Sequence, residues 1–137
     1  YHLDGIRLLH HSQFIAELMS QGLLTAERGG ASFAYHDPCE LGRGLGIYEE
    51  PRAVLGTIGR LEEVADNRDK ALCCGGSLAH LGLDLAQRNM IVSGVCAKFE
   101  ATGADFLVTS CPMCKKSLSR SAKMRVVDIA EAVAGII

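Results

Sequence analysis

The sequence has few aromatic side chains and no excess of charge of one sign, and both shortages exclude classes of function. Aromatic residues make up 5% of the 137 residues and tryptophan is absent, so base-stacking platforms for single-stranded nucleic acid are not indicated. Fourteen basic and sixteen acidic residues leave a formal net charge of −2, and the basic residues are scattered apart from Lys115 and Lys116. We therefore predict no nucleic-acid partner.

Long apolar runs and a secretory leader are also missing. No stretch approaches the roughly 20 apolar residues that cross a bilayer, so we predict no membrane span. The chain opens at Tyr1 without the basic and apolar regions of a signal peptide, which favours a cytoplasmic location and a piece of a longer protein. Apolar residues nevertheless form 48% of the chain, enough for the core of one domain.

The hydrophobic periodicity predicts helices that alternate with strands. We expect helices at residues 12–20, 50–60, 81–102, 111–122 and 128–134, and strands at residues 32–35, 61–65, 105–109 and 125–127. Ser12 is the expected cap of the first helix, and residues 25–31 and 40–48 are expected to be loops. Such alternation is typical of an α/β fold with a mostly parallel sheet of three or four strands and flanking helices.

The sequence contains six cysteines, which in a chain without a secretory leader favour metal or redox chemistry over structural disulfides. They are Cys39, Cys73, Cys74, Cys96, Cys111 and Cys114. Cys96 lies on the apolar stripe of the helix expected at residues 81–102, so we interpret it as a core residue. A disulfide between Cys111 and Cys114 is the alternative for that pair if no metal is bound.

The other five cysteines follow the predicted strands. Cys39 follows the first strand, Cys73 and Cys74 follow the second, and Cys111 and Cys114 follow the third. Because the carboxyl ends of parallel strands share one edge of a sheet, these loops are expected to meet in one crevice. The sequence therefore predicts that five sulfurs converge at the C-terminal ends of the strands.

The residues around these cysteines favour a charged inorganic group. Pro112 places the CxxC motif at the start of a helix, whose positive end, with Lys115 and Lys116, is expected to favour thiolate, the form that binds metal. Gly75 and Gly76 leave room for a cluster beside the Cys-Cys pair. We interpret Gly42, Gly44 and Gly46, which follow Cys39, in the same way.

Two classes of function remain open on these residues. Structural zinc takes four ligands, and two adjacent cysteines do not easily share one tetrahedral ion, so five thiols favour a redox domain over a zinc scaffold. A cubane cluster also needs only four cysteines. A dithiol enzyme would use Cys111 and Cys114 and leave the other three unexplained.

Two other residues near the cysteines are candidates for a functional role. His36 either orients the Cys39 loop, bonds a cluster sulfur or is an ordinary loop histidine. Arg43, in the loop after Cys39, is a weaker candidate.

From about Ser32 to its end the chain resembles the CCG, or cysteine-rich, domain family. That family includes the cysteine-rich subunits of heterodisulfide reductase, the iron–sulfur subunits of glycolate oxidase and of anaerobic glycerol-3-phosphate dehydrogenase, and lactate-utilisation proteins. The motifs that carry the resemblance are His36-Asp37-Pro38-Cys39, Leu41-Gly42-Arg43, Pro51-Arg52, Cys73-Cys74-Gly75 and Cys111-Pro112-Met113-Cys114.

The resemblance implies an iron–sulfur domain that transfers electrons within an oxidoreductase complex, or that takes part in disulfide reduction. It implies a 4Fe-4S cluster, cubane or noncubane, held by Cys39, Cys73, Cys74, Cys111 and Cys114, with structural zinc as the alternative. The implied partners are other redox subunits, a second CCG domain, or a disulfide or quinone-linked partner, with peripheral membrane association through those subunits. Residues 1–30 resemble the connector before a second domain copy, and residues 31–137 the cysteine-rich domain itself.

Overall fold

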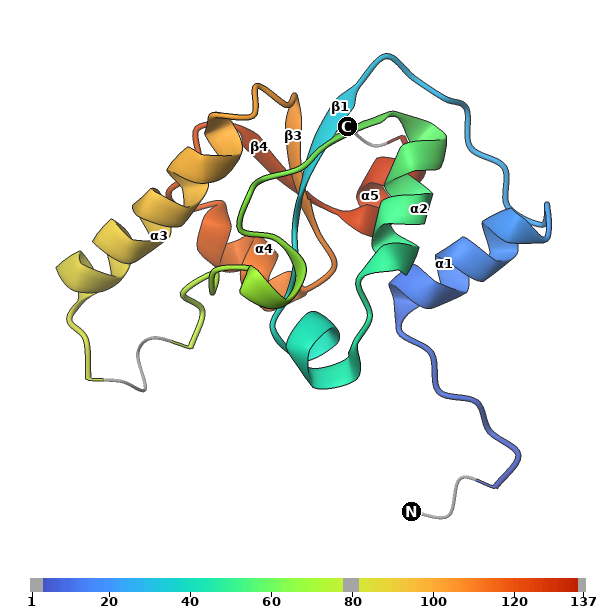
Figure 1. Ribbon diagram of the computed structural model, residues 1–137, viewed down its shortest axis with the longest axis horizontal. Helices are drawn as coiled ribbons and strands as arrows, with labels where there is room; N and C mark the ends of the chain where they lie inside the picture. Colours follow the sequence, from blue (N-terminus) through green and yellow to red (C-terminus); the bar gives the residue numbers. More distant parts are fainter. Residues whose placement is uncertain (1–3, 78–81, 136–137) are drawn as a thin grey trace.

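The computed structural model describes residues 4–77 and 82–135, and a four-stranded parallel sheet runs through the middle of the molecule (Figure 1). The sheet has the order β2-β1-β3-β4, and every neighbouring pair is parallel. Its strands are β1 (Ser32–His36), β2 (Arg60–Glu62), β3 (Phe106–Thr109) and β4 (Arg125–Asp128). The predicted α/β fold class is confirmed.

Helices cover both faces of the sheet. They are α1 (His11–Ser20), α2 (Glu49–Ile58), α3 (Leu85–Glu100), α4 (Pro112–Leu118) and α5 (Ile129–Val133), with a short π-helix η1 (Glu40–Gly44) and a 3-10 turn η2 (Arg68–Lys70). Helices α3 and α4 lie on one face, and α2 and α5, with α1 packed outside them, lie on the other (Figure 1). The domain therefore has three layers.

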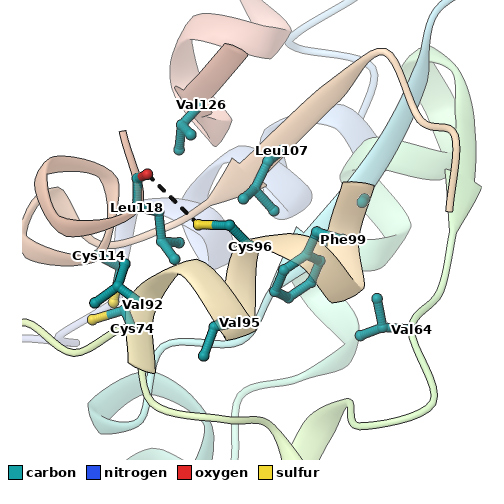
Figure 2. Close-up of a cluster of buried hydrophobic side chains, with 11 residues drawn as sticks. Val64, Cys74, Val92, Val95, Cys96, Phe99, Leu107, Cys114, Leu118 and Val126 are labelled. Atoms are coloured by element: carbon teal, nitrogen blue, oxygen red, sulfur yellow. Dashed lines mark hydrogen bonds between the residues drawn. The ribbon is translucent and has the colours of Figure 1, made fainter. Parts of the chain in front are cut away.

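The alternation of side chains along the strands divides the core between these two faces. Phe33 and Tyr35 of β1 pack with α2 and α5, whereas Ala34, between them, packs with the apolar side of α3. Cys96 lies in the second of these clusters and is 1% exposed, as the sequence predicted. Its thiol donates to the carbonyl of Leu118 (Figure 2).

The helix starts differ from two of the sequence-based expectations. Ser12 does not cap α1, because it is fully buried inside the first turn; His10 is the cap, with Gln13 completing a capping box. The helix predicted at residues 81–102 begins at Leu85, because Asp84 and Gln87 form a capping box there, and residue 81 lies outside the described residues.

Other element boundaries moved by a few residues. The predicted loop at 40–48 contains the π-helix η1, whose wide turn lets the Gly44 N–H donate to the Cys39 carbonyl. The strand predicted at 61–65 is instead β2 at Arg60–Glu62, an edge strand that pairs with three residues of β1. The helices expected at 50–60, 111–122 and 128–134 are each shorter than predicted.

The strand order places the cysteine loops at a reversal of the sheet. The chain leaves β1 toward β2 over α2 and returns to β3, on the other side of β1, over α3. In open parallel sheets such a reversal opens a crevice outside the carboxyl ends of the two central strands. Within the described part of the chain, no helix combines the length and apolarity needed to cross a bilayer.

Candidate metal centre

Three loops at the C-terminal edge of the sheet carry the five predicted site residues. Cys39 follows the end of β1, and Cys111 follows the end of β3, its neighbour in the sheet. Cys73 and Cys74 follow β2 by way of η2. Cys39 and Cys111 therefore lie on either side of the point where the strand order reverses. The Cys-Cys pair approaches the same point from the side of the edge strand β2.

The five sulfurs form one continuous set. The side chains of Cys74 and Cys114 are hydrogen-bonded to each other and lie side by side in Figure 2. Cys73 interacts with both Cys39 and Cys74, and Cys111 interacts with Cys114. All six cysteines are free thiols, so the alternative disulfide between Cys111 and Cys114 is not formed. The convergence expected from the strand order is thus present.

The hydrogen bond between Cys74 and Cys114 shifts the pKa values of the two thiols in opposite directions. The hydrogen bond from the Cys114 thiol lowers the pKa of Cys74 to about 6, and the neighbouring backbone helps. The same bond, with burial, raises the pKa of Cys114 far above its usual range. The expectation that the helix start and its lysines favour thiolate in the CxxC motif stays a prediction. Lys115 pairs with Glu131 on α5.

Backbone amides point at the Cys-Cys pair. The Gly75 N–H donates to the sulfur of Cys73, and the Gly76 N–H donates to the sulfur of Cys74, each at 3.4 Å. Gly75 has a φ of +80°, the left-handed conformation that lets successive amides face one concavity. Amide donors to thiolate sulfur are one of the means by which proteins tune iron–sulfur sites.

The donor set suits a cluster better than one ion. Among the described residues, no three His, Cys, Asp or Glu side chains lie close enough together to hold a single metal ion. Four thiolates around one zinc would require these side chains to rearrange. A cluster distributes its thiolates over several iron atoms, so five connected but separate sulfurs match its needs.

Hydrogen bonds to carbonyl groups tie the three cysteine loops together. Arg43, in the loop after Cys39, donates to the carbonyl of Ala71 at 2.7 Å. The buried His36 at the end of β1 has its Nε2 3.1 Å from the carbonyl of Leu72, directly before the Cys-Cys pair. Ser117 of α4 donates to the carbonyl of Cys74 at 2.6 Å. His36 therefore positions the Cys73–Cys74 segment rather than the Cys39 loop.

A buried ion pair holds the start of the Cys39 loop. Arg52 of α2 donates to both carboxylate oxygens of Asp37, at 2.7 and 2.9 Å, and also to Glu63 at 2.6 Å. Its guanidinium lies over the ring of Tyr35. Burial would lower the pKa of Arg52, but the hydrogen bonds to the two carboxylates outweigh it and raise the pKa. These contacts explain why an Asp-Pro-Cys segment and a distant Pro-Arg occur together.

Gly42 and Gly76 each lack room for a side chain, but different neighbours occupy the space. A Cβ on Gly76 would lie 2.7 Å from the Cγ of Met113 and 3.4 Å from the sulfur of Cys74, so Gly76 does keep the cysteine site open. A Cβ on Gly42 would lie 2.5 Å from the ring of Tyr48. The predicted role of Gly42 in making room for a cluster is therefore wrong, because an aromatic ring fills that space.

Comparison with known proteins agrees with this site. The family model described as a cysteine-rich domain, CCG, matches residues 33–119, and the chain belongs to this family. It is 37% identical over 133 residues to a "probable membrane-anchored ferredoxin" of Chromohalobacter salexigens, covering 91% of this chain and 20% of that protein. It is 33% identical over 141 residues to a subunit of the dihydromethanophenazine:CoB–CoM heterodisulfide reductase of Methanosarcina mazei, covering 93% of this chain and 33% of that protein.

A third relative is the "probable iron-sulfur-binding oxidoreductase FadF" of Bacillus subtilis, 27% identical over 119 residues, which are 85% of this chain and 17% of that protein. The chain thus spans between about a sixth and a third of the length of these relatives. The predicted family is confirmed, and the names of its relatives agree with the predicted iron–sulfur redox class.

Proposed function

We propose that this chain is an electron-transfer domain of an iron–sulfur oxidoreductase and that its five motif cysteines hold the cluster. The observation that carries the proposal is the continuous set of five free thiols at the crevice between the β1 and β3 loops. The ligands would be Cys39, Cys73, Cys74, Cys111 and Cys114. When bound, an iron–sulfur cluster supplies a one-electron redox centre.

The chain's own residues prepare the site in two ways. The amides of Gly75 and Gly76 stabilise negative charge on the sulfurs of the Cys-Cys pair, which favours the thiolate form that binds iron. The ties from Arg43, His36 and Ser117 end on backbone carbonyls, so they fix the loops without occupying a sulfur. A fifth cysteine beyond the four of a cubane supports the noncubane type, and a cubane cluster remains the alternative.

A second candidate function is that of a zinc-stabilised scaffold. The thiols are ligands that zinc accepts, and the CxxC spacing is common in zinc sites. The number of thiols and their separation within the described part of the chain favour the cluster over this alternative.

The rest of the protein's activity is proposed from the family. We propose that residues 31–137 form the redox domain and that residues 1–30 connect it to another part of a longer chain. The partners would be other redox subunits, a second domain of the same kind, or a disulfide or quinone-linked molecule. The location would be cytoplasmic, with peripheral contact to a membrane through those subunits.

Anaerobic reconstitution tests the proposal. The chain would be incubated with iron and sulfide under anaerobic conditions, and iron, sulfide and zinc would be measured together with the electron paramagnetic resonance spectrum. We expect bound iron and sulfide, with a spectrum that is lost or reshaped in Cys73→Ser and in Cys74→Ser. Cys96→Ser is the matched control, because this thiol lies in the core, and it should keep the spectrum. One tightly bound zinc per chain without any cluster signal would contradict the redox function.

A further inference from the structure

A basic pocket opens beside the Cys-Cys pair. It has a volume of about 220 Å³ and is lined by Gly75, Gly76, Arg88, Met113, Lys116, Ser117 and Arg120. Three of these side chains are cationic and none is acidic. Gly75 and Gly76 directly follow Cys74, and Met113 lies inside the CxxC motif, so the pocket borders the cysteine site. We call the cavity with these lining residues the basic pocket.

Among the described residues, the cations of the basic pocket have no ion-pair partner. The neighbouring Lys115, by contrast, is paired with Glu131. Within residues 4–77 and 82–135, no ion pair involves Arg88, Lys116 or Arg120. Arg88 donates through Nε to the carbonyl of Asp84, which is a neutral acceptor.

A bound anion would offset the repulsion between the cations of the basic pocket. Lys116 lies in α4, and Arg120 lies four residues later, just after the helix ends. Like charges repel at this spacing. Arg88 adds a third positive charge from α3. A chain with a net charge of −2 thus gathers three cationic side chains, without ion-pair partners among the described residues, at one concave place next to its cysteines.

The walls of the basic pocket define the kind of ligand. Two guanidinium groups and an ammonium group suit an oxyanion, since guanidinium groups bind carboxylate and phosphate through paired hydrogen bonds. Met113, 55% exposed, supplies an apolar wall on the side of the cysteines. Gly76 keeps this wall in place, because a Cβ there would lie 2.7 Å from the Cγ of Met113.

We propose that the basic pocket binds the carboxylate or phosphate group of a small molecule and so holds the rest of that molecule against Met113, beside the cysteine site. Binding of the anion does not depend on the proposed electron transfer. Only the use of the bound molecule as a redox reactant rests on the proposed function.

Titration with simple oxyanions tests the proposal. The anaerobically reconstituted chain would be titrated with inorganic phosphate and, separately, with citrate in a calorimeter, at an ionic strength held constant with sodium chloride. We expect saturable binding of at least one of the two, and the stronger ligand indicates whether the group is a phosphate or a carboxylate. Lys116→Gln and Arg120→Gln should each weaken it about tenfold, since each removes a charge-assisted contact.

Lys123→Gln is the matched control. Lys123 is exposed and lies just before β4, at the N-terminal ends of the strands, whereas the cysteine loops lie at their C-terminal ends. The same change of charge at Lys123 should leave the affinity unaltered. Equal weakening in all three variants, or no saturable binding, would overturn the proposal. Unchanged affinity with a shifted reduction potential in the two pocket variants would also overturn it, because the cations would then serve the cluster. If no cluster forms but phosphate or citrate still binds as expected, the proposed function fails and the basic pocket stands.

Discussion

Replacement of Arg52 tests how firmly the Cys39 loop is held. The side chains of Arg52 and Asp37 are 5% and 3% exposed, and two hydrogen bonds of 2.7 and 2.9 Å join them. In Arg52→Met the Asp37 carboxylate would stay buried and would keep the hydrogen bond from the backbone N–H of Arg68. Loss of one partner of a buried pair costs about 3–5 kcal/mol, so we expect a fall of that size in the free energy of unfolding.

Urea unfolding at neutral pH measures this effect. Arg60→Met is the matched control: Arg60 pairs with Glu62 at the surface, where its side chain is 66% exposed, and such pairs contribute at most about 1 kcal/mol. Asp37→Asn in the Arg52→Met background should cost less than the sum of the single changes, because the neutral amide removes the unpaired charge. Arg52→Met should also lose iron more readily, since Asp37 lies two residues before Cys39. Equal costs for Arg52→Met and Arg60→Met would refute the reasoning.

Two further predictions concern packing. Cys96→Ala should cost about 1 kcal/mol, because it removes one buried atom that contacts the carbonyl of Leu118, and it should leave the iron content unchanged; iron loss in that variant would make Cys96 a site residue. Gly42→Ala should cost about 1–3 kcal/mol in thermal or urea unfolding, because its Cβ meets the ring of Tyr48, whereas Gly76→Ala should cost less than about 1 kcal/mol, because the exposed Met113 can move aside. The opposite order would refute this account of the two glycines.

The fold could be predicted because its signals are local. Strands that alternate with amphipathic helices indicate a parallel sheet, and the carboxyl ends of parallel strands lie at one edge whatever the details of the loops. Three strand–cysteine junctions were therefore sufficient to predict that Cys39, the Cys-Cys pair and the CxxC motif come together. The same reasoning identified Cys96 as a core residue, because helical spacing alone places it with Val92 and Phe99.

The features that the sequence did not reveal depend on contacts between distant segments. The pKa of Cys74 is lowered because its side chain is hydrogen-bonded to Cys114, which lies 40 residues further along the sequence. Tyr48 occupies the space above Gly42, although a glycine in a cysteine loop resembles one that makes room for a cluster. Arg88 and Arg120 are ordinary surface residues in sequence, and only the packing of α3 beside α4 brings them to one pocket. In the sequence, the basic residues Lys116 and Arg120 shortly after the CxxC motif were the available sign of such a pocket.

The way in which the loops are tied decides what remains available for iron. The bonds from Arg43, His36 and Ser117 end on the carbonyls of Ala71, Leu72 and Cys74, so each fixes the backbone of the Cys-Cys segment without using a sulfur as its partner. Each of these partly buried hydrogen bonds contributes about 0.5–1.5 kcal/mol, so together they hold the segment whether or not metal is bound. Binding then has to order side chains rather than whole loops, which lowers its entropic cost. An electron-transfer site gains from this arrangement, because a backbone that is fixed in advance keeps the surroundings of the redox centre the same in both oxidation states.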